Sequence, residues 1–158
     1  MRTKFSVSAI IEKDVLIGQG SFVWYFTHLM DGVRLGMNCS VGEKSFIGRR
    51  VLIGDNVRIG NNVNIYEGAI IRNDVFIGNN VSFTNVRKPK ATKKASKILN
   101  TIIEDGVSIG ANATIVGGVR VGKDSIIGDG SVVISNVPDG VFAVGNPAKI
   151  IKKEKEYE

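Results

Sequence analysis

The feature that most constrains this chain is a repeat of six residues. An aliphatic residue, or in one case a phenylalanine, recurs at every sixth position in two blocks, and a small or β-branched residue follows each of the aliphatic residues four places later. An α-helix needs apolar spacing near 3.6 and a simple strand needs 2, so this period indicates neither element alone. Eighteen hexads obey both parts of the rule, and a nineteenth, which begins at Phe83, has Arg87 four places later. The nineteen hexads begin at Ile11, Ile17, Val23, Leu29, Leu35, Val41, Ile47, Ile53, Ile59, Ile65, Ile71, Ile77, Phe83, Ile103, Ile109, Ile115, Val121, Ile127 and Val133.

A coil with short straight faces accounts for these hexads. In each one, the aliphatic and the small residue would point inward from a short strand, and the polar pair between them would turn a corner. Glycine follows the aliphatic residue in ten hexads, as in Ile53-Gly54-Asp55-Asn56-Val57. Gly, Asn and Asp tolerate the left-handed backbone that corners often need. The pattern therefore predicts an all-β chain that winds around one core.

This repeat resembles the hexapeptide-repeat family, whose fold is a left-handed parallel β-helix with three hexads in each triangular coil. The hand is implied by the resemblance, since the period alone does not fix it. Nineteen hexads then predict about six coils, and rungs about 4.8 Å apart would make a prism ~30 Å tall. With 158 residues, the chain is expected to form one domain, residues 1–158.

The hexads are interrupted once, between Phe83 and Ile103. We expect residues 84–102 to form a loop that projects from a corner of the prism and carries a basic run from Arg87 to Lys97. This run lacks interleaved aromatic residues, so phosphate binding or simple solvation is favoured over a nucleic-acid partner. Residues 139–158 are expected to form a C-terminal tail, with a short solvated helix from Lys149 to Glu158.

The composition excludes several classes of protein. The apolar runs are short and interrupted, so the sequence predicts no transmembrane helix and no membrane partner. The N-terminus lacks the apolar stretch of a signal peptide, and the single Cys39 cannot form an intrachain disulfide. Both observations agree with a cytoplasmic protein. The formal net charge of +6 is concentrated in the loop and the tail, so a small polyanion is one candidate ligand.

Residues 18 apart would stack in columns, because three hexads make one coil. One predicted column reads Asp31, Arg49, Glu67 and Asn85, and the adjoining outward column reads His28, Phe46, Asn64 and Ser82. The basic loop leaves the prism directly after Asn85, so it could overhang this polar stripe. A polar stripe beside a loop is a reasonable place for a ligand.

Structural alternatives exist for most of these residues. Asp31, Arg49 and Glu67 alternate in charge, so a ladder of ion pairs between rungs would explain them without a function. Asn62 shares its hexad offset with other asparagines, where Asn suits a corner, whereas Asn64 lies at an outward offset that no corner requires. His28 is the only histidine, and a lone histidine is more often a surface or packing residue.

Longer segments resemble one subgroup of the family, the N-acetyltransferases that act on UDP-2-acetamido-3-amino-2,3-dideoxyglucuronate, with close relatives that act on dTDP-3-amino sugars. This resemblance implies transfer of an acetyl group from acetyl-CoA to the amine of a nucleotide-linked amino sugar, in surface polysaccharide or glycan biosynthesis, by a homotrimer. Members of the subgroup commonly carry His where this chain has Tyr25. The segments that carry the resemblance are residues 23–28, 61–68, 83–86, 110–116 and 144–149.

The resemblance also implies a place for each substrate. The sugar would lie near Asn62, Glu67 and Asn85, and coenzyme A would run along the later coils, with its adenine end by residues 145–149. The chemistry can use an amide donor to the oxyanion, and His28 or Glu67 could accept the proton of the amine, although the departing thiolate could also take it. The expected site residues are Asn85, Glu67 and His28 for catalysis, Asn62, Asn64, Tyr66 and Trp24 for the sugar substrate, and Gly117, Gly118, Asn146, Pro147 and Lys149 for acetyl-CoA.

Three rival interpretations remain open from the sequence. A zinc enzyme of the γ-carbonic anhydrase type shares the prism but needs three histidines, and this chain has one, so no metal is expected. An O-acyltransferase of the same fold would need a histidine base for a hydroxyl acceptor, and only His28 is available. A non-catalytic structural prism is the third, and failure to bind acetyl-CoA would favour it.

Overall fold

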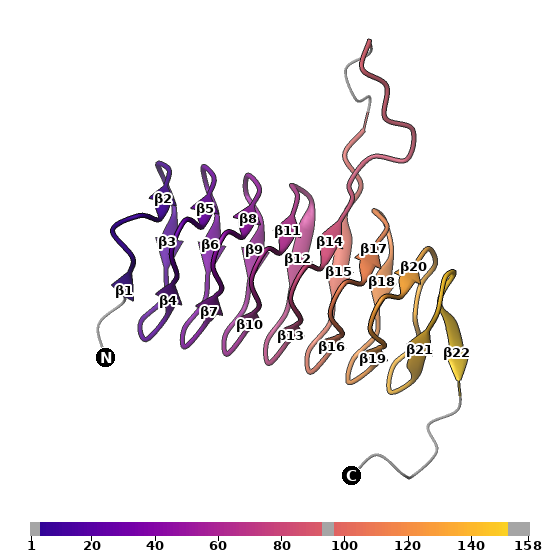
Figure 1. The fold of residues 1–158 in the computed structure, drawn as a ribbon. Helices are drawn as coiled ribbons and strands as arrows, with labels where there is room; N and C mark the ends of the chain where they lie inside the picture. Colours follow the sequence, from indigo (N-terminus) through magenta and orange to yellow (C-terminus); the bar gives the residue numbers. More distant parts are fainter. Residues whose placement is uncertain (1–3, 93–96, 152–158) are drawn as a thin grey trace.

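The computed structural model describes residues 4–92 and 97–151, and every regular element in this part of the chain is a β-strand. The strands are short, and each hexad contributes one. They stack into three parallel sheets that form the faces of a triangular prism, seen from the side in Figure 1. The architecture is a left-handed parallel β-helix, which confirms the predicted fold class.

We call the three faces sheets A, B and C. Sheet A contains β1 (Lys4–Phe5), β4 (Phe22–Val23), β7 (Ser40–Val41), β10 (Arg58–Ile59), β13 (Phe76–Ile77), β16 (Ser108–Ile109), β19 (Ile126–Ile127), β21 (Phe142–Val144) and β22 (Lys149–Ile151). Sheet B contains β2 (Ile10–Ile11), β5 (His28–Leu29), β8 (Phe46–Ile47), β11 (Asn64–Ile65), β14 (Ser82–Phe83), β17 (Thr114–Ile115) and β20 (Val132–Val133). Sheet C contains β3 (Leu16–Ile17), β6 (Arg34–Leu35), β9 (Leu52–Ile53), β12 (Ala69–Ile71), β15 (Thr101–Ile103) and β18 (Arg120–Val121).

The core follows the hexad rule. The side chains that begin the hexads are buried from Val23 to Val133, and the small residue four places later is buried from Ser21 to Val137. Most corners place one residue in the left-handed region, such as Asn56 with φ 58° and Asn62 with φ 56°. Three of these corner residues have longer side chains, Phe26, Lys44 and Arg50.

The number of coils exceeds the prediction of about six. The nineteen predicted hexads correspond to strands β2 to β20, but β1 precedes them and β21 extends sheet A beyond them. The prism therefore has about seven turns. The C-terminal tail also differs from the expected helix, because Lys149–Ile151 form β22, which pairs antiparallel with β21. The rest of the expected helix, residues 152–158, lies outside the described residues.

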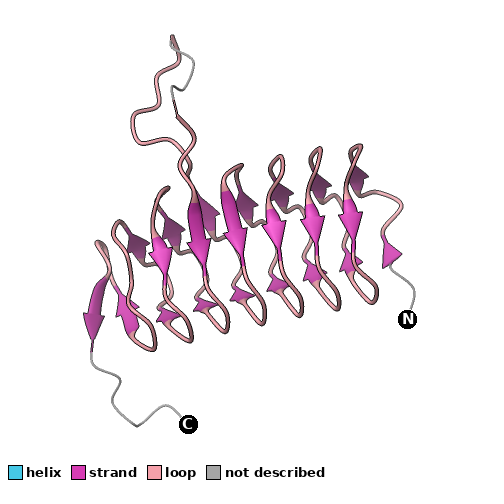
Figure 2. Cartoon of the chain, turned by 180° about the vertical axis from the view of Figure 1, so that it is seen from behind, coloured by secondary structure: helices cyan, strands magenta, loops and turns pink. Residues whose placement is uncertain are grey.

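The predicted loop leaves the corner between sheets B and C and spans residues 84–100, since Thr101 and Ile102 already belong to β15. Its base is fixed to the prism, because the main-chain N–H of Leu99 donates to Asn85 O at 2.9 Å. The described part of the loop projects away from the prism in both views (Figures 1 and 2). Lys93 and Lys94 of the basic run lie outside the described residues.

Candidate functional site

Two of the residues expected in catalysis meet at the base of the loop, at the corner where sheet B turns into sheet C. We call this edge the B–C corner. The side-chain amide of Asn85 donates from Nδ2 to the main-chain oxygen of Glu67 at 3.1 Å. The two residues are one coil apart, as the predicted columns require. The side-chain amide of Asn85 and the main chain of Glu67 therefore lie together where the loop leaves the prism.

The carboxylate of Glu67 forms an ion pair with Arg50, not with Arg49 as the ladder interpretation had it. The bond to Glu67 raises the pKa of the Arg50 guanidinium. Arg50 is the more exposed partner, because its side chain is 73% exposed against 25% for Glu67. An open groove of about 280 Å³ lies beside the pair on the sheet C side, and it is lined by Arg50, Leu52, Glu67, Gly68, Ala69, Ile70, Ile98 and Asn100.

His28 lies outward on sheet B, but away from Asn85. Its strand, β5, is three rungs from β14, which is about 14 Å at the usual spacing of parallel strands. Nε2 of His28 donates to Oε1 of Glu12 at 2.7 Å, and Oε2 of Glu12 accepts the main-chain N–H of Asp31 at 3.0 Å. Both hydrogen bonds lower the pKa of the Glu12 carboxyl, and the bond from Asp31 has the larger effect. Within one chain, His28 and Asn85 cannot act on the same amine.

The residues expected to bind the sugar separate into two groups. Asn64 points outward from sheet B, next to Ser82 on the following rung. Tyr66 follows at the B–C corner, where its ring is 43% exposed. Asn62 and Trp24 lie instead at the corner between sheets A and B, the A–B corner. Asn62 occupies the left-handed position of that corner, which supports its structural interpretation.

The indole of Trp24 turns toward sheet A. Its ring packs edge-on against Phe22 with centroids 4.7 Å apart, and Nε1 donates to Ser40 Oγ at 3.2 Å. Both partners belong to sheet A strands. Trp24 is therefore not part of the outward face of sheet B that carries Asn64.

The residues expected to bind acetyl-CoA lie at two different corners. Gly117 and Gly118 follow β17 at the B–C corner, whereas Asn146 and Pro147, joined by a cis peptide bond, connect β21 to β22 and are followed by Lys149 in β22. This turn lies by sheet B, because the next residue, Ala148, donates its main-chain N–H to Val132 O at 2.9 Å. A ligand that touched both groups in one chain would have to cross sheet B.

Gly117 also has a structural reason to be glycine. A Cβ at this position would come within 2.8 Å of Thr84 O and 2.9 Å of the Asn85 Cα. The main-chain N–H of Gly117 donates to Thr84 Oγ1 at 3.0 Å. The glycine therefore lets the later coil pack closely beneath Asn85. The space left by the missing Cβ is filled by the main chain of Thr84 and Asn85.

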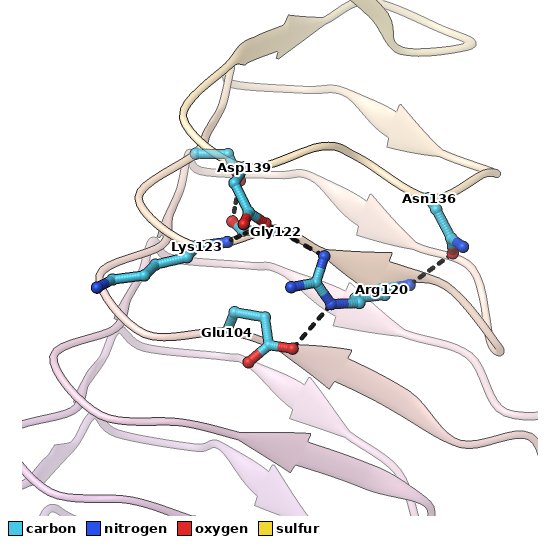
Figure 3. Close-up of polar contacts among 7 residues, drawn as sticks. Glu104, Arg120, Gly122, Lys123, Asn136 and Asp139 are labelled. Carbon is cyan, nitrogen blue, oxygen red and sulfur yellow. Dashed lines mark hydrogen bonds and ion pairs between the residues drawn. The ribbon is translucent and has the colours of Figure 1, made fainter.

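A separate polar cluster lies on sheet C, around Arg120 (Figure 3). Its guanidinium donates to Glu104 at 2.8 Å and to Asp139 at 3.2 Å, and its main-chain N–H donates to the side chain of Asn136 at 2.8 Å. Asp139 also accepts the main-chain N–H of Lys123 at 3.0 Å. Because each acidic group already has a partner, this cluster holds the last coil in place.

Sequence reasoning missed two partners of the expected site residues, Glu12 and Arg50. It also missed that the ring of Phe46 contacts both His28 and Tyr66. Glu12 pairs with His28 across 16 residues and Arg50 with Glu67 across 17. A search for partners at offsets of 16 and 17 as well as 18 would have found both pairs.

Within residues 4–92 and 97–151, no group of three or more His, Cys, Asp or Glu side chains is placed to hold a metal ion.

Comparisons with known proteins agree with the prism. The family described as bacterial transferase hexapeptide (six repeats) matches residues 50–85 and 100–135, and the hexapeptide repeat of succinyl-transferase matches residues 8–49. The chain is 58% identical over 55 residues to a 2,3,4,5-tetrahydropyridine-2,6-dicarboxylate N-acetyltransferase of Clostridium perfringens, a match that covers 35% of this chain and 23% of that protein. The chain thus matches less than a quarter of this relative's length.

Solved structures give matches over more of the chain. WeeI from Acinetobacter baumannii has a TM-score of 0.62 at 26% identity, over 92% of this chain and 56% of that one. A hexapeptide-repeat acetyltransferase from Vibrio cholerae, solved with acetyl coenzyme A, has a TM-score of 0.58 at 29% identity, over 73% and 71% of the two chains. No helix in the described ranges is long and apolar enough to cross a membrane. The repeat, the three-sided prism and these matches together show that the chain belongs to the hexapeptide-repeat transferase family.

Proposed function

We propose that this protein transfers an acetyl group from acetyl-CoA to the amine of a nucleotide-linked amino sugar. The observation that carries the proposal is the juxtaposition of Asn85 and Glu67 at the base of the loop. Acetyl-CoA as donor is supported by the Vibrio cholerae relative, whose structure contains it. Transfer to nitrogen is supported by the name of the Clostridium relative, an N-acetyltransferase. The choice of an amino sugar as acceptor rests on segments such as residues 61–68 and 83–86, which resemble those of nucleotide-sugar N-acetyltransferases.

The reaction forms one bond and breaks one. The neutral amine attacks the thioester carbonyl carbon, negative charge develops on the carbonyl oxygen, and the carbon–sulfur bond then breaks to release the thiol of coenzyme A. The amine loses one proton and the departing thiolate gains one. Most of the rate can come from holding the amine against the thioester, because a neutral amine is already a good nucleophile.

Asn85 and Glu67 suit two steps of this reaction. A primary amide has two N–H donors, and Asn85 uses one of them on the Glu67 main chain. The other is available to stabilise the oxyanion, a contribution worth about 3 kcal/mol in other enzymes. The Glu67 carboxylate would accept the extra proton of the ammonium form and so supply the neutral amine that attacks, after Arg50 has moved aside, while the proton lost on forming the amide goes to the thiolate.

We propose further that the working unit is a homotrimer. The residues expected to hold acetyl-CoA lie at opposite edges of sheet B, so a single prism does not bring them together. A neighbour packed in a head-to-tail sense would set its A–B corner against the B–C corner of the first, and such heterologous contacts close into a ring. Light scattering should then give a mass about three times 17.0 kDa.

The test is thiol release from acetyl-CoA across a panel of UDP- and dTDP-amino sugars, their hydroxyl analogues, and the cyclic dicarboxylate named for the Clostridium relative. We expect release only with the amino sugars, and release that persists in EDTA. Release only with hydroxyl analogues would replace the proposal by O-acyl transfer. Release only with the dicarboxylate would replace the acceptor, and no binding of acetyl-CoA would favour a structural prism.

A further inference from the structure

A row of three aromatic rings crosses sheet B next to Glu67. The ring of Phe46 lies between the other two, with its centroid 5.6 Å from that of His28 and 5.5 Å from that of Tyr66. His28 and Phe46 are partners on adjacent strands, β5 and β8. Tyr66 reaches the row from the B–C corner.

One end of the row is held by hydrogen bonds, and the row remains accessible to solvent. His28 is fixed by Glu12, whose other oxygen is bound by the main chain of Asp31. The His28 side chain is 31% exposed and Tyr66 is 43% exposed, while Phe46 is half-buried. A fixed aromatic surface that faces solvent presents a ready stacking partner for a flat heteroaromatic ring.

The outer face of sheet B changes character along the prism. Rings occupy β5 and β8, and short polar side chains follow on the next three strands as Asn64, Ser82 and Thr114. A nucleotide sugar has the same division, with a flat base at one end and a ring of hydroxyl groups at the other. Aligned in this order, its sugar would lie beside Glu67 and Asn85, and its base two rungs away, at about 10 Å.

Arg49 offers a positive charge for the diphosphate that joins the base to the sugar. It lies at the B–C corner on the same coil as Phe46, and it is exposed. Among the described residues its side chain forms no hydrogen bond or ion pair, and its charge acts on the Glu12 carboxyl, whose pKa it helps to lower, while Glu67 pairs with Arg50. A guanidinium in this position is suited to a diphosphate.

We propose that the outer face of sheet B binds the nucleoside diphosphate part of the acceptor, with its base stacked on Phe46 and its phosphates on Arg49. This inference rests on the proposed function, and it gives the stacking role to a ring of sheet B and not to Trp24, which was expected to bind the sugar substrate but whose indole packs on sheet A. The adenosine diphosphate of coenzyme A has the same chemistry, so the test compares the two sources.

The experiment is titration calorimetry of the full chain with UDP, dTDP and ADP. Phe46→Leu keeps an apolar side chain and removes the ring, and Phe76→Leu is the matched control, because Phe76 is also an outward residue of a strand but belongs to sheet A. We expect Phe46→Leu to weaken binding of UDP or dTDP at least fivefold and Phe76→Leu to leave it unchanged. Arg49→Ala should weaken both nucleotides and reduce the salt dependence of binding.

Equal affinity of wild type and Phe46→Leu for both pyrimidine nucleotides would overturn the inference, as would a loss confined to ADP. Light scattering and thermal melting of each variant show whether a loss is due to altered assembly or folding, and a loss explained in that way also counts against the site. Acetyl transfer is measured on the same preparations. A wild type that acetylates amines without binding UDP or dTDP contradicts only this inference, whereas pyrimidine binding through Phe46 without acetyl transfer contradicts only the proposed function.

Discussion

The side-chain amide of Asn85 is bound to the main-chain oxygen of Glu67, one coil away, at 3.1 Å. The Glu67 side chain is free of this bond and pairs with Arg50. The amide is thus oriented by the backbone, while the carboxylate is held by a partner that is mostly exposed to solvent. Loss of the Asn85 amide should therefore reduce turnover, whereas loss of Arg50 should change turnover and stability little. This pair of outcomes separates a catalytic corner from a structural ladder of ion pairs.

The first prediction concerns Asn85. We expect Asn85→Ala to reduce kcat/KM for the amino sugar at least tenfold, about 1.4 kcal/mol of transition-state stabilisation. The matched control is Asn79→Ala, at an A–B corner, where Oδ1 of Asn79 accepts the main-chain N–H of Asn61 at 2.8 Å. The control should lower the melting temperature and leave turnover per folded molecule unchanged. Equal turnover by Asn85→Ala and wild type would remove Asn85 from the site.

The second prediction concerns the ion pair at the B–C corner. Glu67→Gln should lower turnover at least tenfold, because a neutral amide cannot accept the proton of the amine. Arg50→Ala should keep turnover within about twofold of wild type and change the melting temperature little, since exposed ion pairs contribute little to stability. If Glu67→Gln instead shifts the melting temperature strongly and leaves kinetics unchanged, the pair is structural.

The third prediction concerns His28. Three rungs separate its strand from β14, which ends two residues before Asn85. We therefore expect His28→Asn to raise KM for the nucleotide sugar and to leave the pH profile of kcat as in wild type. Rates measured between pH 6 and pH 9 at saturating acetyl-CoA provide the check. A deficit that higher pH partly relieves would show that the imidazole acts as the base, and would require a neighbouring copy to bring it to the amine.

The sequence predicts the prism well, because the inward residues of every coil must be apolar or small and therefore recur every six positions. The alternation of Ile59 and Val63, both buried, recurs so regularly that the inward and outward positions need no coordinates. Corners are less predictable. Arg49 and Arg50 are adjacent, and the choice of Arg50 as partner of Glu67 depends on its left-handed backbone, with φ 54°, which redirects the side chain.

The end of the prism shows a second limit of prediction. The hexads stop at Val133, yet β21 continues sheet A without them and β22 turns back against it. The charged stretch after Lys149 resembles a solvated helix by composition alone. Pairing with β21 outweighs that local preference for residues 149–151, because the last rung otherwise leaves its main-chain groups without partners.

The fourth prediction is the pH dependence of the pair formed by Glu12 and His28. Hydrogen bonds from Asp31 and His28 lower the pKa of Glu12 below its ordinary value of 4.5. A lowered carboxyl pKa stabilises the fold above the unfolded pKa, and that stability is lost as the pH falls through the folded pKa. We expect Glu12→Gln to melt below wild type at pH 7 and the difference to shrink below pH 4.5. A difference that stays constant from pH 7 to pH 3 would contradict this linkage.

The last prediction asks whether Gly117 serves the fold or acetyl-CoA, and it uses a second glycine as the control. A Cβ at Gly117 would meet the main chain of Thr84 and Asn85 at 2.8 and 2.9 Å. Gly130 has φ 66° and open space around it, so a Cβ there meets only backbone strain. We expect Gly117→Ala to cost about 2–3 kcal/mol and Gly130→Ala about 1 kcal/mol, measured by denaturation at equal protein concentration. Because the clash lies beneath Asn85, Gly117→Ala should also lower kcat, whereas KM for acetyl-CoA should change less than twofold. If Gly117→Ala melts like wild type and raises that KM, the glycine is kept for the pantetheine arm.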